Sequence, residues 1–72
     1  MKNGIVFSEH AKQRMKERNI NESQINRTIN KPEIGFAEEM FRKVSKKINK
    51  RELEVEYIEN GKMKKVITVR WK

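Results

Sequence analysis

The second half of the chain alternates apolar and polar residues. From Val44 to Trp71 the apolar side chains recur mostly at every second position, in three stretches separated by turn residues. A period of two is typical of β-strands that bury one face. The pattern predicts three antiparallel strands, at about 40–48, 51–58 and 63–71. Residues 34–36 (Ile-Gly-Phe) are either a short additional strand or a loop packed on the sheet edge.

The strand register follows from the turns, because a slip of one residue moves every side chain to the other face. A two-residue Asn49-Lys50 loop sets Val44 opposite Val55, which keeps both on one face. At the next turn, a two-residue Asn60-Gly61 loop would split the apolar set between the faces.

We therefore expect a three-residue loop over 59–61, with Gly61 left-handed, which pairs Leu53 with Ile67 and Tyr57 with Met63. The predicted apolar face consists of Val44, Ile48, Leu53, Val55, Tyr57, Met63, Ile67, Val69 and Trp71.

The opposite face carries charges of alternating sign. Lys47 falls opposite Glu52 and Lys43 opposite Glu56, an arrangement typical of cross-strand ion pairs worth about 0.2–1 kcal/mol each. Unpaired positive charge is then expected on the first helix and at a few positions of the strands: Arg42, Lys46, Lys50, Arg51 and Lys72.

The first half of the chain has the signals of two helices. Ser8 is a good N-cap for a helix ending near Arg18, with Asn19 suited to a left-handed C-cap. Asn21 with Gln24 predicts a capping box, and Ile20 and Ile25 form the matching hydrophobic staple. Pro32 should end this second helix near Asn30.

These elements predict an α+β fold: two N-terminal helices packed on a three- to four-stranded antiparallel sheet. Residues 1–72 would form a single domain, with a helical hairpin over 8–30 and an antiparallel meander over 34–71. Residues 5–7 (Ile-Val-Phe) are either a short β-like segment or the lead-in to the first helix.

The composition favours an acidic partner in a reducing compartment. The 72 residues include 18 Lys and Arg against 10 Asp and Glu, a formal net charge of +8. Such a basic domain is suited to a polyanion such as nucleic acid. There is no cysteine, and no apolar run approaches the length of a membrane span, so we expect a cytoplasmic protein that does not associate with membranes.

The first helix holds the strongest candidate site. His10, the single histidine, is followed by Arg14 and Arg18 at intervals of four, which places all three along one line of a helix. Elsewhere the sequence offers little for chemistry. The glutamates of the strands have basic or serine neighbours opposite them, so we expect no metal site and no cofactor.

Cleavage of RNA without a metal needs few protein groups. The 2′-hydroxyl of the RNA is the nucleophile, so the protein supplies a base, an acid for the leaving oxygen and cations for the phosphorane charge. A histidine near a helix N-terminus beside arginines meets part of this requirement. The acid would have to be Tyr57, a lysine or an arginine. The plainer alternative is a surface histidine with two basic neighbours.

The pattern His10-Ala11-x-x-Arg14-x-x-x-Arg18-x-Ile20, a capped second helix and a last strand Val66-Ile67-Thr68-Val69 resemble domain-of-unknown-function family 4258. That family is thought to be similar to RelE-like toxins, within a group of metal-independent ribonucleases that includes barnase. The resemblance implies a RelE/barnase-like fold and assigns the motif positions His10, Arg14, Arg18 and Thr68 as catalytic.

The leading functional hypothesis is therefore a toxin-like, metal-independent endoribonuclease of a toxin–antitoxin or phage system. Its partners would be RNA, either free or ribosome-bound mRNA, and a protein antitoxin, and the chain would be a monomer or homodimer. Lys12, Lys46 and Arg70 are the expected nucleic-acid-binding residues. In the predicted register, Thr68 and Arg70 reach His10 only if the first helix lies over a sheet edge.

Two alternatives remain open from the sequence. One is a non-catalytic basic module that binds nucleic acid or protein, which explains the charge without a catalytic site. The other is a small phage or plasmid inhibitor that docks through Phe41 and Ile58, an apolar pair on the charged face.

Overall fold

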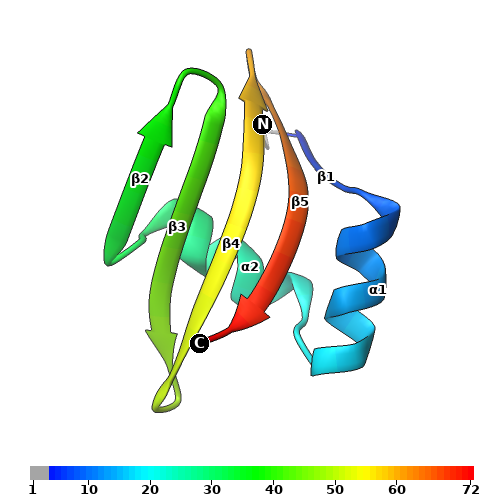
Figure 1. Ribbon diagram of the computed structural model, residues 1–72, viewed down its shortest axis with the longest axis vertical. Helices are drawn as coiled ribbons and strands as arrows, with labels where there is room; N and C mark the ends of the chain where they lie inside the picture. The colour runs from blue at the N-terminus through cyan, green and yellow to red at the C-terminus, as the bar shows by residue number, and fades with distance from the viewer. Residues whose placement is uncertain (1–3) are drawn as a thin grey trace.

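The sheet is built around an antiparallel meander of four strands, to which the N-terminus adds a fifth. The computed structural model describes residues 4–72 (Figure 1). Its strands run in the order β1-β5-β4-β3-β2, and all neighbours are antiparallel except β1 and β5, which are parallel. The elements in chain order are β1 (Gly4–Phe7), α1 (Glu9–Arg18), α2 (Glu22–Asn30), β2 (Ile34–Glu38), β3 (Phe41–Ile48), β4 (Arg51–Asn60) and β5 (Met63–Trp71).

The α+β class and the two N-terminal helices are confirmed, whereas the predicted three- to four-stranded antiparallel sheet is wrong in two respects. The sheet has five strands, and β1 makes it mixed. A four-residue strand is too short to show a period of two, so its pairing partner cannot be read from the local pattern. Its place beside β5 is set by contacts distant in sequence, with Phe7 opposite Val66.

Both helices begin and end where their capping residues indicate. Ser8 accepts a hydrogen bond from the Ala11 amide at the start of α1, and Asn19 adopts the left-handed conformation at its end. At the start of α2, Asn21 and Gln24 form the reciprocal capping box. Neither helix has the length or apolar composition to cross a bilayer.

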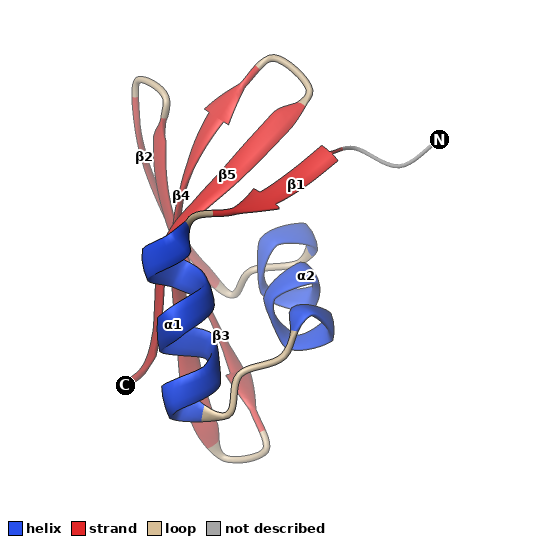
Figure 2. Cartoon of the chain, turned by 90° about the vertical axis from the view of Figure 1, so that its right-hand side faces the viewer, coloured by secondary structure: helices blue, strands red, loops and turns tan. Residues whose placement is uncertain are grey.

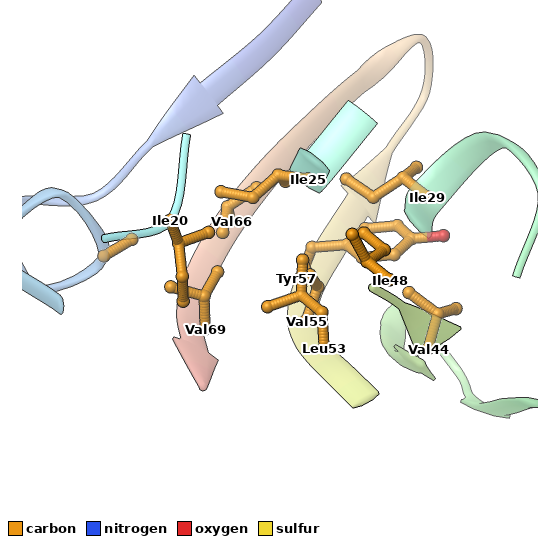
Figure 3. Packing of buried hydrophobic residues seen from close by; sticks show 11 residues of the cluster. Ile20, Ile25, Ile29, Val44, Ile48, Leu53, Val55, Tyr57, Val66 and Val69 are labelled. Atoms are coloured by element: carbon orange, nitrogen blue, oxygen red, sulfur yellow. The ribbon is translucent and has the colours of Figure 1, made fainter. Parts of the chain in front are cut away.

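The two helices occupy different parts of the sheet. α2 lies across β3 and β4 on one face, and α1 runs beside β5 (Figures 1 and 2). We call the face covered by α2 the helix face and the other the open face. Between α2, α1 and the helix face lies the buried core (Figure 3), which consists of Ala11, Ile20, Ile25, Ile29, Val44, Ile48, Leu53, Val55, Tyr57, Val66 and Val69.

The β3–β4 turn has the predicted two-residue loop. Asn49 and Lys50 both have positive φ, as a type I′ turn requires, and Val44 pairs with Val55. The ion-pair columns on the open face are in the predicted register as well, with Lys43 opposite Glu56 and Lys47 opposite Glu52.

The predicted β4–β5 loop over 59–61 is wrong. The loop is Gly61-Lys62, with Asn60 opposite Met63, although Gly61 does have the expected positive φ of 63°. The register then shifts by one residue between Glu56 and Tyr57, a β-bulge that leaves one extra residue on β5. The bulge returns the apolar side chains of β5 to the face that they share with β4. In the prediction from the sequence, a longer loop had this effect.

The bulge also changes the membership of the apolar face. Val66 is fully buried opposite Tyr57, whereas Met63 is 48% exposed and Ile67 lies outside the buried core. Val69 pairs with Val55, and Trp71 pairs with Leu53 while packing against the core. The predicted pairs of Leu53 with Ile67 and of Tyr57 with Met63 are therefore wrong.

Ser8 joins α1 to the sheet, and its replacement tests that role. Its hydroxyl both accepts from the Ala11 amide and donates to the Ile67 carbonyl at 3.1 Å. We expect Ser8→Ala to lower the free energy of unfolding by about 1–2 kcal/mol, the upper range for an N-cap, because two buried or half-buried groups lose a partner.

Urea denaturation followed by circular dichroism measures this loss. The matched control is Ser23→Ala in the first turn of α2, an exposed position that is not the cap residue. A loss no larger for Ser8→Ala than for Ser23→Ala would contradict the anchoring role.

Candidate functional site

The candidate site lies where α1 closes one edge of the sheet. β1 pairs with β5 only as far as Val66, and from there the chain turns into α1. The Ser8 amide donates to the Val66 carbonyl at 3.0 Å, and the Arg18 guanidinium donates to the Val69 carbonyl at 2.8 Å. α1 therefore follows the second half of β5 and replaces a neighbouring strand there (Figure 2).

The rotation of α1 about its own axis determines which side chains face which surface. Ala11 is fully buried and Met15 packs against the core, so this side of α1 faces the helix-face interior. Each residue turns the helix by about 100°. Around the helix, Arg18 lies between Met15 and Arg14, and its guanidinium contacts the edge of β5 at the Val69 carbonyl. Arg14 and His10 lie beyond Arg18, on the flank away from Met15, and this flank is therefore toward the open face.

Thr68 occupies the open face of the adjacent strand. It pairs with Glu56, whose side chain belongs to the open face, and it is half-buried. It directly follows Ile67, whose carbonyl binds Ser8 at the start of α1. The edge position of α1 thus brings the first turn of the helix beside this part of β5. The sequence analysis required this position of the helix for Thr68 and His10 to share one surface.

His10 is exposed in the first turn of α1. Amide groups that have no carbonyl partner within the helix, and the positive end of the helix dipole, lie at the start of an α-helix. In α1 one of these amides, that of Ala11, is capped by Ser8. Both features favour a bound anion. Glu9 in the same turn has the opposite effect on the local potential.

Arg14 is held by a residue that the sequence analysis did not consider. Its guanidinium forms an ion pair with Glu17 at 2.8 Å, and this hydrogen bond lowers the pKa of the Glu17 carboxyl. Exposed pairs of this kind contribute little to stability. A phosphate group can therefore compete with Glu17 for Arg14. Arg14 and Glu17 are three residues apart, a spacing typical of ion pairs on a helix, so the sequence contained the signal for this pair.

Arg18 has a structural role. One of its terminal nitrogens caps the Val69 carbonyl on the edge of β5, and its own carbonyl accepts the Trp71 indole N–H at 2.8 Å. A guanidinium has five N–H donors, so those not used at Val69 can still contact an anion. Arg18 is thus tied to the sheet, while Arg14 is restrained only within the helix.

Arg70 is on the open face but is already neutralised. Its Nε donates to Glu54 at 2.6 Å, and Lys43 approaches the other oxygen of that carboxylate at 3.4 Å. Burial of Glu54, whose side chain is 4% exposed, pushes its pKa up, but the hydrogen bond and positive charge of Arg70, together with Lys43, outweigh this and leave the pKa lowered. Arg70 therefore stabilises a buried carboxylate rather than offering a free cation.

Lys12 and Lys46 lie apart from His10. Lys12 is exposed and is two residues from His10, which places it on the opposite flank of α1. Lys46 pairs with Leu53, so it projects from the helix face, not from the face that carries Thr68. These two lysines and the candidate catalytic residues do not share one surface.

Tyr57, which the sequence analysis considered as the general acid, does not lie at this site. It is buried among apolar side chains of the helix face, beside Ile29 and Ile48 (Figure 3). Burial also raises the pKa of its hydroxyl, with a smaller contribution from Glu59. Its position on the other side of the sheet rules it out as the proton donor to a group bound at His10.

The distribution of free cations differs partly from the prediction. Arg42 pairs with Glu59 at 3.5 Å and Lys72 with Glu52 at 3.8 Å, so neither is unpaired as expected. Arg51 stacks on the Trp71 ring at 4.6 Å. Within residues 4–72, the acidic and histidine side chains form no group of three that could hold a metal ion.

A family model described as a domain of unknown function, DUF4258, matches residues 7–71. The chain belongs to this family. The match begins at Phe7, immediately before the Ser8 cap, and ends at Trp71, so it covers both helices and the meander. Searches of curated proteins and of solved structures gave no match.

The Glu54–Arg70 pair makes stability depend on pH. A carboxyl whose pKa is lowered by folding adds stability above its unfolded pKa of about 4.3, and this contribution disappears as the pH falls through the folded value. We expect Glu54→Gln to lower the free energy of unfolding by about 1–2 kcal/mol at neutral pH, and the difference from wild type to shrink below about pH 4.

Urea denaturation at a series of pH values measures this dependence. The control is Glu52→Gln, which removes a carboxylate that is one-third exposed and pairs with Lys72 across 3.8 Å. That change should have less than about 1 kcal/mol of effect at any pH. A Glu54→Gln loss that is constant from pH 7 to pH 3 would show that the ion pair is not its source.

Proposed function

We propose that this chain is a metal-independent endoribonuclease whose site is the junction of α1 with β5. The observation that carries the proposal is the position of α1 at the sheet edge, with His10 and Arg14 on the flank toward the face of Thr68. A base, a cation and a hydroxyl are thereby available to one phosphodiester. His10 is exposed to solvent, and an open surface of this kind suits a long single strand rather than a small molecule.

In the proposed reaction the RNA supplies its own nucleophile. His10 accepts the proton of the 2′-hydroxyl as its oxygen attacks the adjacent phosphorus. The bond from phosphorus to the 5′-oxygen then breaks, which gives a 2′,3′-cyclic phosphate and a 5′-hydroxyl. With a single histidine in the chain and Tyr57 in the core, we assign protonation of the leaving oxygen to water.

Arg14 would stabilise the charge that develops on the phosphorane. A guanidinium is suited to this role because it can donate two parallel hydrogen bonds to phosphate oxygens. It must first leave Glu17, and an exposed ion pair of this kind is weak. Arg18 would contribute positive potential while it keeps α1 fixed against β5.

The second candidate function is RNA binding without cleavage. The observation that favours it is the exposure of His10 and the wide distribution of the other basic residues, with Lys12 and Lys46 away from the candidate site. Contacts of this kind recognise the phosphate backbone and weaken steeply with salt. A protein antitoxin or the ribosome as partner remains part of the first proposal.

An RNA cleavage assay in the presence of EDTA separates the two functions. We expect wild type to yield fragments that end in 2′,3′-cyclic phosphate. His10→Ala and Arg14→Ala should each lower the rate by about 10²-fold or more, since positioned proton transfer and phosphorane stabilisation contribute on that order. Lys16→Ala, which removes an exposed charge from the same helix, is the matched control.

Cleavage that persists undiminished in His10→Ala would exclude His10 as the base. Binding of RNA that weakens with salt, with no fragments in any variant and no dependence on His10, would instead establish the second function.

The Arg14–Glu17 pair gives an additional test. Because Glu17 competes with phosphate for Arg14, we expect Glu17→Gln to bind single-stranded RNA about 2-fold more tightly at low salt, and Arg14→Ala to bind it more weakly. Fluorescence anisotropy with a labelled oligonucleotide measures both. An equal gain from Glu17→Gln in the Arg14→Ala background would mean that the effect is only the change in net charge.

A further inference from the structure

The two edges of the sheet are treated very differently. The β5 edge is covered by β1 and then by α1, with its carbonyls at Val66, Ile67 and Val69 bonded to Ser8 and Arg18. The other edge is β2, and all five of its residues are exposed. β2 therefore presents a free strand edge to solvent (Figure 1).

β2 lacks most of the features that prevent edge-to-edge association, and its single charged residue, Glu38, stands at its end. Natural edge strands are protected by lysine, proline, a bulge or a covering segment. The strand Ile-Gly-Phe-Ala-Glu has none of these within it, and its pairing with β3 is regular. Two large apolar side chains, Ile34 at 61% and Phe36 at 56% exposure, project from its open face.

The register identifies which backbone groups are free. β2 and β3 are joined by the two-residue loop Glu39-Met40, so Glu38 and Phe41 form a hydrogen-bonded pair, and alternate residues repeat that pairing. Ile34 and Phe36 therefore bond to β3. The N–H and C=O groups of Gly35 and Ala37 point away from the sheet, ready to pair with another strand.

We infer that this edge pairs with the β2 edge of a second copy of the chain, antiparallel and centred on Gly35. In that register Gly35 faces the partner's Gly35, and the outward N–H and C=O groups of the two glycines bond to each other. Ala37 falls opposite the partner's Glu33, whose N–H already donates to the Ser45 carbonyl of its own chain. The two five-stranded sheets become continuous across a two-fold axis, which closes the association at a dimer.

Side chains support this register over the neighbouring one. Ile34 falls opposite the partner's Phe36, twice by symmetry, in the non-hydrogen-bonded positions where side chains are closest. Beyond the strand ends, Lys31 at the end of α2 lies on the side of the partner's Glu39 in the β2–β3 turn, also twice. Centring on Phe36 instead would pair Gly35 with the partner's Ala37, but it would set Ile34 against the partner's Glu38.

Charge also favours this edge over others for self-association. The chain carries a net charge of +8, which opposes contact between most of its surfaces. Residues 32–41 contain three glutamates and no basic residue, flanked by Lys31 and Arg42. An antiparallel pair therefore brings the acidic end of one segment to the basic end of the other. This inference is independent of the proposed catalytic function.

Sedimentation over a concentration series tests for the dimer. We expect wild type to shift from monomer to dimer, and Phe36→Ser to raise the dissociation constant by about tenfold, since two apolar cross-strand pairs are lost. Met63→Ser is the control, because Met63 is similarly exposed but lies on the strand that pairs with β1, at the far side of the sheet.

A charge-reversal experiment tests the register itself. In a dimer of Lys31→Glu, two acidic side chains approach each other at both ends of the interface, and in a dimer of Glu39→Lys two basic side chains do. Each variant should therefore associate more weakly than wild type. An equimolar mixture of the two variants restores both attractive pairs and should form a heterodimer. No other arrangement of the two chains predicts this pattern, and neither residue belongs to the proposed RNA site.

Two results would overturn the inference. One is a wild-type chain that remains monomeric up to about 1 mM, where even a dissociation constant of 1 mM would produce dimer; this outcome would leave the edge to a strand of a different protein. The other is a dimer that responds equally to Phe36→Ser and Met63→Ser, or whose charge variants do not recover on mixing. Circular dichroism of each variant verifies that it is folded.

Discussion

The closure of the β5 edge by the N-terminal segment is the interaction on which the rest of the structure depends. β1 pairs with the first half of β5, and α1 continues along the second half, where no strand is available to bond its carbonyls. Where β1 ends and α1 begins, the Ser8 hydroxyl caps the helix and also donates a hydrogen bond to β5. Because unpaired backbone groups at a sheet edge are costly when buried, this closure determines where α1 lies and how it is rotated.

The same contacts link stability to the candidate chemistry. Arg18 fastens the end of α1 to Val69, and Trp71 returns a hydrogen bond to Arg18, so the helix cannot rotate without losing both. The flank that carries His10 and Arg14 is consequently held toward the open face. On that face, Glu54 binds Arg70 and Lys43, so its charges largely cancel within the sheet.

Local signals in the sequence predicted the secondary structure well, because each of them acts over a few residues. The Ser8 cap, the Asn21–Gln24 capping box and the Asn49-Lys50 turn were all confirmed. The predicted length of the β4–β5 turn was wrong because two different backbone arrangements place the apolar residues on one face. A loop that is one residue longer and a bulge in β5 both change by one residue which side chains of β5 face the core. The structure has the bulge. Only cross-strand packing, with Val66 rather than Met63 against Tyr57, distinguishes them.

For the site, the sequence alone determined the line of His10, Arg14 and Arg18 along one helix, since helical spacing is a local property. It also contained the Arg14–Glu17 spacing, three residues apart in that helix. Only the tertiary structure decided that α1 lies at a sheet edge, that Arg18 binds a strand carbonyl, that Arg70 is held by a buried carboxylate, and that Tyr57 belongs to the core. Each of these depends on groups that are 16 or more residues apart in the chain or on opposite faces of the sheet, and no periodicity within one segment encodes such a contact.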